Sequence, residues 1–255
     1  MARPGSPLAF EKLALTGFYP RIHAAKLKPT PIYRDYLSLY VERDLRQIFE
    51  LKNLRQFEIF LRLCAGRMGQ LFNASALASE VGVSVHTIQE WLSILEASFL
   101  VFLLQPWHSN IGKRLVKSPK LYFYDTGLAA CLLGFESAEQ IARDPLRGAI
   151  FENLVVADIR KNLFHTDREP FLHFYRDSNG SEVDLIVRIQ GKLVPVEIKS
   201  ASTYHPDFFK GLVNFQKVCP ESAKEGWIVY NGTPEVNVRG HRLVRWANAA
   251  DRILS

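Results

Sequence analysis

The sequence SEVDLIVRIQGKLVPVEIKS, residues 181–200, predicts two β-strands joined by a tight turn. Apolar side chains occupy every second position in both halves, which is typical of strands in a sheet. The alternate positions carry Glu182 and Asp184 in the first strand, and Glu197 and Lys199 in the second. These four charged groups therefore share one face of the hairpin.

A turn centred on Gln190-Gly191 fixes which of these side chains face each other, and Gly191 suits a tight turn. Asp184 would face Glu197, and Glu182 would face Lys199, with opposed Cβ atoms about 5 Å apart. Two carboxylates that close repel each other unless a cation lies between them. A hard divalent ion such as Mg²⁺ or Mn²⁺ takes oxygen ligands from one or two carboxylates and from a substrate phosphate. We therefore expect a metal site at Asp184 and Glu197, beside which Lys199 would stabilise charge on the phosphate.

A simpler interpretation is that the charged face is solvated, with Glu182 and Lys199 as an ordinary cross-strand ion pair. A helix expected over residues 148–164 favours the metal site, because Glu152 lies on the same side as four apolar residues. A carboxylate on an apolar stripe is costly to bury unless a metal or a basic group meets it. The four apolar residues are Val155, Val156, Ile159 and Leu163.

The remaining pattern after residue 148 predicts a mixed sheet flanked by helices, in the order α-β-β-β-α-β. The fold class is therefore mixed α/β. The expected strands cover residues 171–176, 182–189, 193–199, 227–230 and 241–246, and a helix covers 206–219.

The first half of the chain contains a predicted helix-turn-helix within residues 73–102, after helices expected at 36–49 and 54–64. Ser75 and Ser84 could cap its two short helices, and Gly82 suits the turn between them. Two β-rich runs follow, at 99–104 and 120–124, as in the hairpin of a winged helix. Residues 1–34, rich in Pro and Gly at the start, are expected to form an extended arm.

Nucleic acid is the partner that the first half favours, since the hairpin loop is basic and the net charge of the chain is +6. Three side chains of the second short helix could reach base edges, and three of the loop could reach phosphates. Winged helices also dock proteins, so a docking module stays open. The base-edge candidates are His86, Thr87 and Gln89, and the phosphate candidates are Lys113, Arg114 and Lys117.

The composition is that of an ordinary globular protein, with 47% hydrophobic and 12% aromatic residues among 255. It excludes general disorder. The most apolar run, residues 97–104, is far shorter than the roughly 20 residues of a membrane span. The three cysteines have no disulfide or zinc spacing, and the start has no apolar stretch of signal-peptide length, so we expect a cytoplasmic protein.

Asp184 and, after 12 intervening residues, Glu197-Ile198-Lys199 resemble the PD-(D/E)xK nuclease motif, with Val183 in place of its proline. Glu152 is similar to the extra acidic residue of the Holliday-junction resolvase and RecB-like branches. Three segments resemble the C-terminal half of a family of prokaryotic AAA-type ATPases, in which the ATPase precedes a winged helix and a nuclease-like domain. These segments are IFENLVVADIRK (150–161), FYRDSNGSEVDLIV (174–187) and VPVEIKS (194–200); TGFYPRI (16–22) resembles the junction after the ATPase.

The resemblance implies a winged helix over residues 35–146 and a restriction-endonuclease-like domain over 147–255, with residues 1–34 as a remnant of an ATPase lid. It further implies a Mg²⁺-dependent DNA endonuclease. Asp184 and Glu197 would hold the metal, Glu152 would be a further ligand, and Lys199 would position the attacking water. No GxxxxGK[ST] phosphate loop occurs, so ATP hydrolysis is not implied and a separate AAA-type ATPase is an expected partner. A catalytically silent DNA-binding or docking module remains the alternative.

Overall fold

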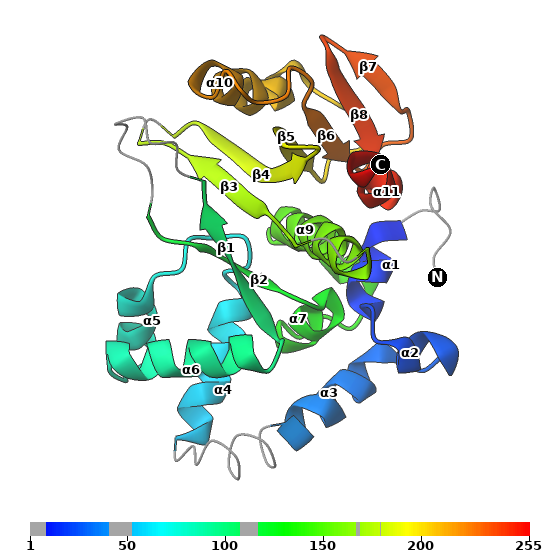
Figure 1. Ribbon diagram of the computed structural model, residues 1–255. Coiled ribbons are helices and arrows are strands. Elements are labelled where there is room, and N and C mark those ends of the chain that lie inside the picture. Colours follow the sequence, from blue (N-terminus) through cyan, green and yellow to red (C-terminus); the bar gives the residue numbers. More distant parts are fainter. Residues whose placement is uncertain (1–8, 41–52, 108–116, 167–168, 179) are drawn as a thin grey trace. The chain divides into compact units, whose positions relative to one another are not determined.

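The computed structural model describes residues 9–40, 53–107, 117–166, 169–178 and 180–255 (Figure 1). The chain divides into two compact units. The first comprises Met1–Leu103 and Leu121–Ile150, and the second comprises Leu104–Lys120 and Phe151–Ser255. Among the described helices, none has the length and apolar character needed to cross a bilayer.

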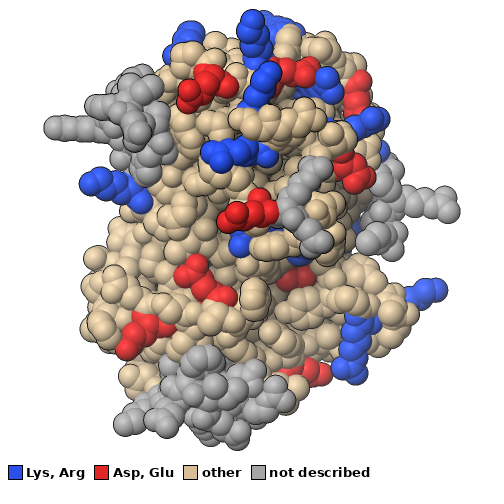
Figure 2. Space-filling view, viewed as in Figure 1, with Lys and Arg blue, Asp and Glu red and all other residues tan. Residues whose placement is uncertain are grey.

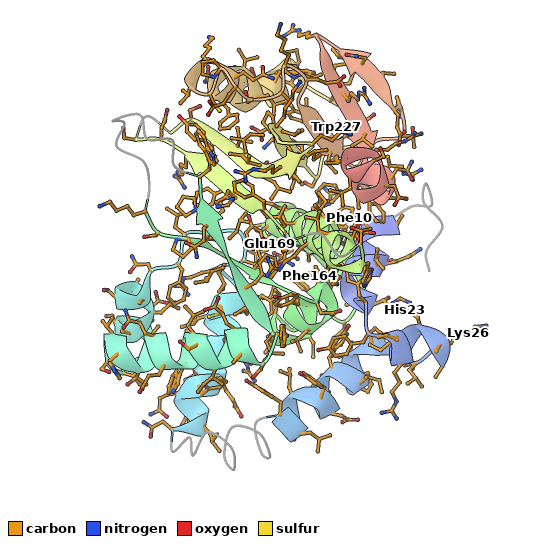
Figure 3. All side chains as sticks on the ribbon, in the orientation of Figure 1. Phe10, His23, Lys26, Phe164, Glu169 and Trp227 are labelled. Atoms are coloured by element: carbon orange, nitrogen blue, oxygen red, sulfur yellow. The ribbon has the colours of Figure 1, made fainter. Side chains whose placement is uncertain are left out.

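The first unit is mainly helical. The extended arm expected over residues 1–34 is wrong for the described part, because its helices bury Phe10, Ala14, Ile22 and Tyr33. Phe10, labelled in Figure 3, lies under the guanidinium of Arg147 at 4.8 Å from the ring centroid. The helices are α1 (Ala9–Thr16), α2 (Pro20–Ala24), α3 (Pro29–Leu39), α4 (Leu54–Ala65), α5 (Ala74–Val81), α6 (Val85–Ala97), α7 (Thr126–Leu132), α8 (Ala138–Arg143) and the start of α9 (Arg147–His165).

Helices α5 and α6 form the predicted helix-turn-helix pair, with one correction at the first cap. Asn73 Oδ1 accepts a hydrogen bond from the Ala76 amide at 3.0 Å, so Asn73 caps α5 and not Ser75. Gly82 has a φ of 78°, and Ser84 Oγ accepts from the Thr87 amide at 3.0 Å, which confirms the predicted turn and second cap. The helix expected over 36–49 begins earlier, in α3, and its residues 41–49 lie outside the described residues.

A buried carboxylate joins distant parts of the first unit. Asp125 caps α7 by accepting from the Leu128 amide at 3.0 Å, and it also accepts from the Phe18 amide at 2.7 Å and the Tyr33 hydroxyl at 2.6 Å. Burial and the negative charge of Asp125 raise the pKa of Tyr33, which keeps its hydroxyl protonated as a donor. Gly17, with a φ of 67°, permits the chain to pass Tyr33, since a Cβ there would overlap the hydroxyl.

The sheet is mixed and has the strand order β2-β1-β3-β4-β5-β6-β8-β7 (Figure 1). Strands β3, β4 and β5 are antiparallel, whereas β5, β6 and β8 are parallel. The expected order α-β-β-β-α-β is confirmed, with β7 added. The strands are β1 (Val101–Pro106), β2 (Lys120–Phe123), β3 (Leu172–Arg176), β4 (Glu182–Ile189), β5 (Lys192–Lys199), β6 (Trp227–Tyr230), β7 (Val236–Val238) and β8 (His241–Arg245).

The hairpin of β4 and β5 has the predicted register. Leu185 pairs with Val196 and Ile189 with Lys192, which centres the turn on Gln190-Gly191. Both turn residues have positive φ, 48° and 80°, as a two-residue hairpin turn of the primed type requires. The next position along the same ladder places Asp184 across from Glu197.

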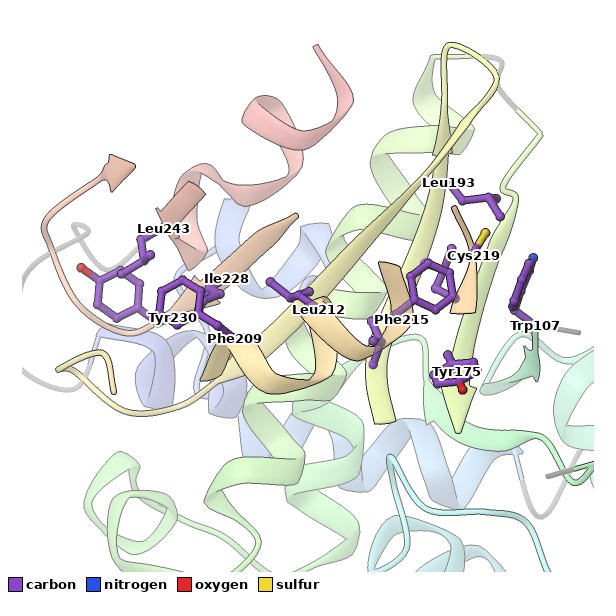
Figure 4. Close-up of a cluster of buried hydrophobic side chains, with 12 residues drawn as sticks. Trp107, Tyr175, Leu193, Phe209, Leu212, Phe215, Cys219, Ile228, Tyr230 and Leu243 are labelled. Atoms are coloured by element: carbon purple, nitrogen blue, oxygen red, sulfur yellow. The ribbon is translucent and has the colours of Figure 1, made fainter. Parts of the chain in front are cut away.

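Helix α10 (Lys210–Val218), preceded by η2 (Pro206–Phe209), covers one face of β4 and β5. Figure 4 shows Leu212 and Phe215 of α10 directed at an apolar cluster that includes Ile228 and Tyr175. This cover buries the charged face of the hairpin, so the interpretation of that face as solvated is wrong: Asp184 is 7% exposed and Glu197 is 5% exposed. The chain ends with η3 (Trp246–Asn248) and α11 (Ala249–Leu254).

We expect the second unit to lose stability at acidic pH because of His241. Its Nδ1 accepts a hydrogen bond from the Gly226 amide at 3.0 Å, and burial lowers the pKa of the imidazole, opposed by Glu225. The stabilising effect of the neutral ring is complete above its unfolded pKa of about 6.5 and is lost as the pH falls through the folded value. Thermal unfolding at pH 7.5 and 5.5 should show a larger drop in Tm for the wild type than for His241→Asn. Equal drops would contradict this role.

Candidate functional site

Three predicted residues meet at the carboxyl end of β5 and on the adjoining part of β4. Lys199 Nζ lies 3.1 Å from Asp184 Oδ2 and 2.8 Å from Glu197 Oε2. The Ile198 amide donates to Asp184 Oδ2 at 2.8 Å, which fixes that carboxylate against β5. Since β4 and β5 are in the predicted register, the sequence pattern identified this cluster correctly.

The two carboxyl groups interact with each other, and their pKa values shift in opposite directions. Burial opposes ionisation of Asp184, but Lys199 and Lys120 outweigh it and hold the pKa of Asp184 below its ordinary value. Burial, and then repulsion by Asp184, raise the pKa of Glu197 well above its ordinary value. Of the two carboxyl groups, Glu197 is therefore the one that takes up a proton first, and a divalent cation at this pair would compete with that proton.

Glu152 is held by a residue that sequence reasoning missed. Lys120 Nζ lies 3.1 Å from Glu152 Oε1 and 2.6 Å from Glu182 Oε1. Burial would lower the pKa of Lys120, but Glu152, Asp184 and Glu182 together raise it, so the ammonium stays charged. Within the described residues, no group of three His, Cys, Asp or Glu side chains is placed to hold a metal. The role of Glu152 as a further ligand stays a prediction.

A cleft of about 760 Å³ opens over Asp184, Glu197 and Lys199. Its other wall is the exposed side of α10, where Lys210, Asn214 and Lys217 follow one another at helical spacing. The helix comes close at Gly211, because a Cβ there would overlap Glu197 Oε1 and the Glu182 carbonyl oxygen. The cleft thus combines buried carboxylates at its floor with lysines at its rim.

The described residues that are predicted to contact nucleic acid are not among those that line this cleft. His86 pairs with Glu90 at 3.5 Å, the Thr87 hydroxyl bonds with Ser84 Oγ at 2.8 Å, and Gln89 is exposed. Lys117 is exposed, whereas Lys113 and Arg114 lie outside the described residues. The stretch of α5 and α6 contains no Lys or Arg. These contacts remain predictions.

Figure 2 shows how charge is distributed over one face. The coloured Lys and Arg side chains stand singly or in small groups, with Asp and Glu between them. Among the side chains that the structure describes, the net charge of +6 does not appear on that face as one basic patch.

Residues 8–139 match the family described as a domain of unknown function, DUF8612, over slightly more than half of the chain. The chain belongs to the DUF8612 family. A second match, to the domain of unknown function DUF4143, covers residues 147–248. Lys120 falls in the DUF8612 region, whereas Glu152, Asp184, Glu197 and Lys199 fall in the DUF4143 region.

Two curated proteins resemble this DUF8612 chain. They are the uncharacterized protein Rv2008c of Mycobacterium tuberculosis and the uncharacterized protein Mb2031c of Mycobacterium bovis. Each is 32% identical over 188 residues, which are 73% of this chain and 42% of the relative. The 188 matched residues thus cover less than half of the length of these relatives.

Proposed function

We propose that this chain is a metal-dependent phosphodiesterase that cleaves DNA. One observation carries the proposal: Asp184, Glu197 and Lys199 converge at the floor of an open cleft, where both carboxyl groups bind the same ammonium. This combination is costly to bury for structural purposes alone. It also matches the spacing that resembles the PD-(D/E)xK motif.

The donor set fits a hard divalent cation such as Mg²⁺ or Mn²⁺. Asp184 and Glu197 offer oxygen ligands from two strands, and both line the cleft from which a phosphate would approach. Burial and repulsion by Asp184 raise the pKa of Glu197, and a positive charge between the two carboxyl groups would relieve that repulsion. When bound, the metal would lower the pKa of a water molecule and polarise the phosphate.

The chain's own residues would hold the cation, orient the attacking water and stabilise charge on the phosphate. Asp184, fixed by the Ile198 amide, and Glu197, fixed against Gly211, would hold the cation in one position. The Lys199 ammonium would orient the attacking water and stabilise the negative charge that develops on the phosphate. Lys210 and Lys217 at the rim would contact neighbouring phosphates of the substrate.

Further expectations from the resemblance stay proposals. A winged helix formed around α5 and α6 would bind DNA or dock a protein, and a AAA-type ATPase would be its working partner. A cytoplasmic location is supported by free cysteines at positions 64, 131 and 219. A restriction-endonuclease-like fold of the second unit is supported by the mixed sheet and by the positions of the site residues.

Nicking of supercoiled plasmid tests the proposed function. Wild-type protein should nick in Mg²⁺ or Mn²⁺ and lose this activity in EDTA. Asp184→Asn should reduce the rate by about 10³-fold or more, because it removes a charged ligand from the metal site. Glu225→Gln, which changes a partly exposed carboxylate bound to Arg242, is the matched control and should retain the rate.

Cleavage by Asp184→Asn at the wild-type rate would locate the activity elsewhere. If the folded wild type cleaves no duplex, branched or single-stranded DNA with either metal, the chain is the catalytically silent module instead. Binding of DNA that does not weaken with salt would count against phosphate contacts.

A further inference from the structure

Lys120 is a buried cation among groups that are typical ligands of a divalent ion. Its ammonium contacts Glu182 at 2.6 Å and Glu152 at 3.1 Å, and Asp184 attracts the same charge. Glu152 comes from α9 and Glu182 from β4, so carboxylates of two elements converge on one amine. The Lys120 side chain is only 4% exposed, and its Nζ lies 5.4 Å from the centroid of the Phe174 ring.

The charge balance of the site favours one divalent ion over two. Asp184, Glu197, Glu152 and Glu182 provide four carboxylates, and three cationic side chains contact them. With all four carboxyl groups ionised, as a bound metal requires, these described side chains leave one negative charge, which a single divalent ion more than neutralises. A second such ion would leave a large positive excess in a partly buried site, which is unfavourable without further anions. The cationic side chains are Lys120, Lys199 and Arg176.

We propose that Lys120 is a permanent cation in the place that a second divalent ion would take, so that the chain binds one metal ion, at Asp184 and Glu197. The inference rests on the proposed function. Lys120 keeps Glu152 and Glu182 neutralised and in position when no metal is present. Lys120 is thus a positioning residue, and Glu152 acts on the site through this ammonium.

Binding of Mn²⁺ to the full chain, measured by calorimetry and by the electron paramagnetic resonance of free Mn²⁺, tests the proposal. The wild type should bind one ion. Lys120→Met keeps an apolar chain of similar length against Phe174 but removes the charge, so it should bind two. Lys120→Met combined with Glu152→Gln should return to one ion. Lys192→Met, at an exposed lysine of β5, is the matched control and should bind one.

Two ions in the wild type, or one ion in folded Lys120→Met, would overturn the proposal. If Lys120→Met is unfolded in the absence of metal, its thermal unfolding is measured at increasing Mn²⁺ concentration to test the proposal instead. A cooperative transition that Mn²⁺ restores supports the proposal, and a chain that stays unfolded at every concentration refutes it.

The proposed function can fail separately from this inference. A wild type that binds no Mn²⁺ removes the metal site at Asp184 and Glu197. If Lys120→Met then binds one ion, Lys120 still occupies a place for a divalent cation. If neither protein binds Mn²⁺, both proposals fail.

Discussion

Gly211→Ala should reduce plasmid nicking by about 10²-fold or more, although it changes no charged or polar side chain. The added Cβ would overlap Glu197 Oε1 and the Glu182 carbonyl oxygen, so Glu197 must leave its position or α10 must move away. Displacement of a metal-holding carboxylate by about 1 Å is enough for such a loss. Initial nicking rates and Mn²⁺ affinity should fall together.

Instability of α10 would not explain this loss, because alanine favours a helix over glycine by about 1 kcal/mol. Val213→Ala, at an exposed position of the same helix, is the control and should keep both nicking and Tm. A Gly211→Ala protein with wild-type nicking would show that the close approach of α10 has no part in the activity.

Asp125→Ala should destabilise the first unit by about 3–5 kcal/mol, the largest stability effect that we expect from one polar side chain. The substitution removes the acceptor of the Leu128 and Phe18 amides and of the Tyr33 hydroxyl. These donors lie in a buried or partly buried region, where water cannot readily replace the carboxylate. Urea denaturation followed by tryptophan fluorescence would measure the change.

The exposed Asp35 of α3 supplies the comparison for this prediction. Asp35→Ala should alter the free energy of unfolding by no more than about 0.5 kcal/mol. The loss in free energy of unfolding for Asp125→Asn should lie between those of Asp125→Ala and Asp35→Ala. The amide keeps one acceptor oxygen but presents an N–H₂ group to one of the donors. An Asp125→Ala protein as stable as Asp35→Ala would refute the structural role of this carboxylate.

The hairpin at residues 181–200 could be predicted because its signals are local. Alternation assigns each side chain to a face, and the turn at Gln190-Gly191 sets the register. Together they place Asp184 beside Glu197 without knowledge of the rest of the chain. The burial of that face could not be predicted in the same way, because it depends on η2 and α10 packing over the strands.

Contacts between distant segments account for what sequence reasoning missed. Lys120 is 32 residues from Glu152 and belongs to a strand, KLYF, whose four residues are all buried. A lysine beside such an apolar run was the only local signal of a buried charge. Asp125 likewise accepts a hydrogen bond from Tyr33, which is 92 residues away in the sequence, and no periodic pattern predicts that contact. The first cap was misplaced because Asn73 and Ser75 are both good capping residues.

The second unit is discontinuous in sequence, because it includes Leu104–Lys120, a segment that precedes helices α7 and α8 of the first unit. A gene fragment that starts at residue 147 would encode all of the DUF4143 region yet leave β1 and Lys120 behind. Its β3 would lose the partners of His173 and Phe174 and become an open edge that invites self-association. Glu152 and Glu182 would lose the Lys120 ammonium that both of them contact. An intact second unit therefore needs the chain from Leu104 onward.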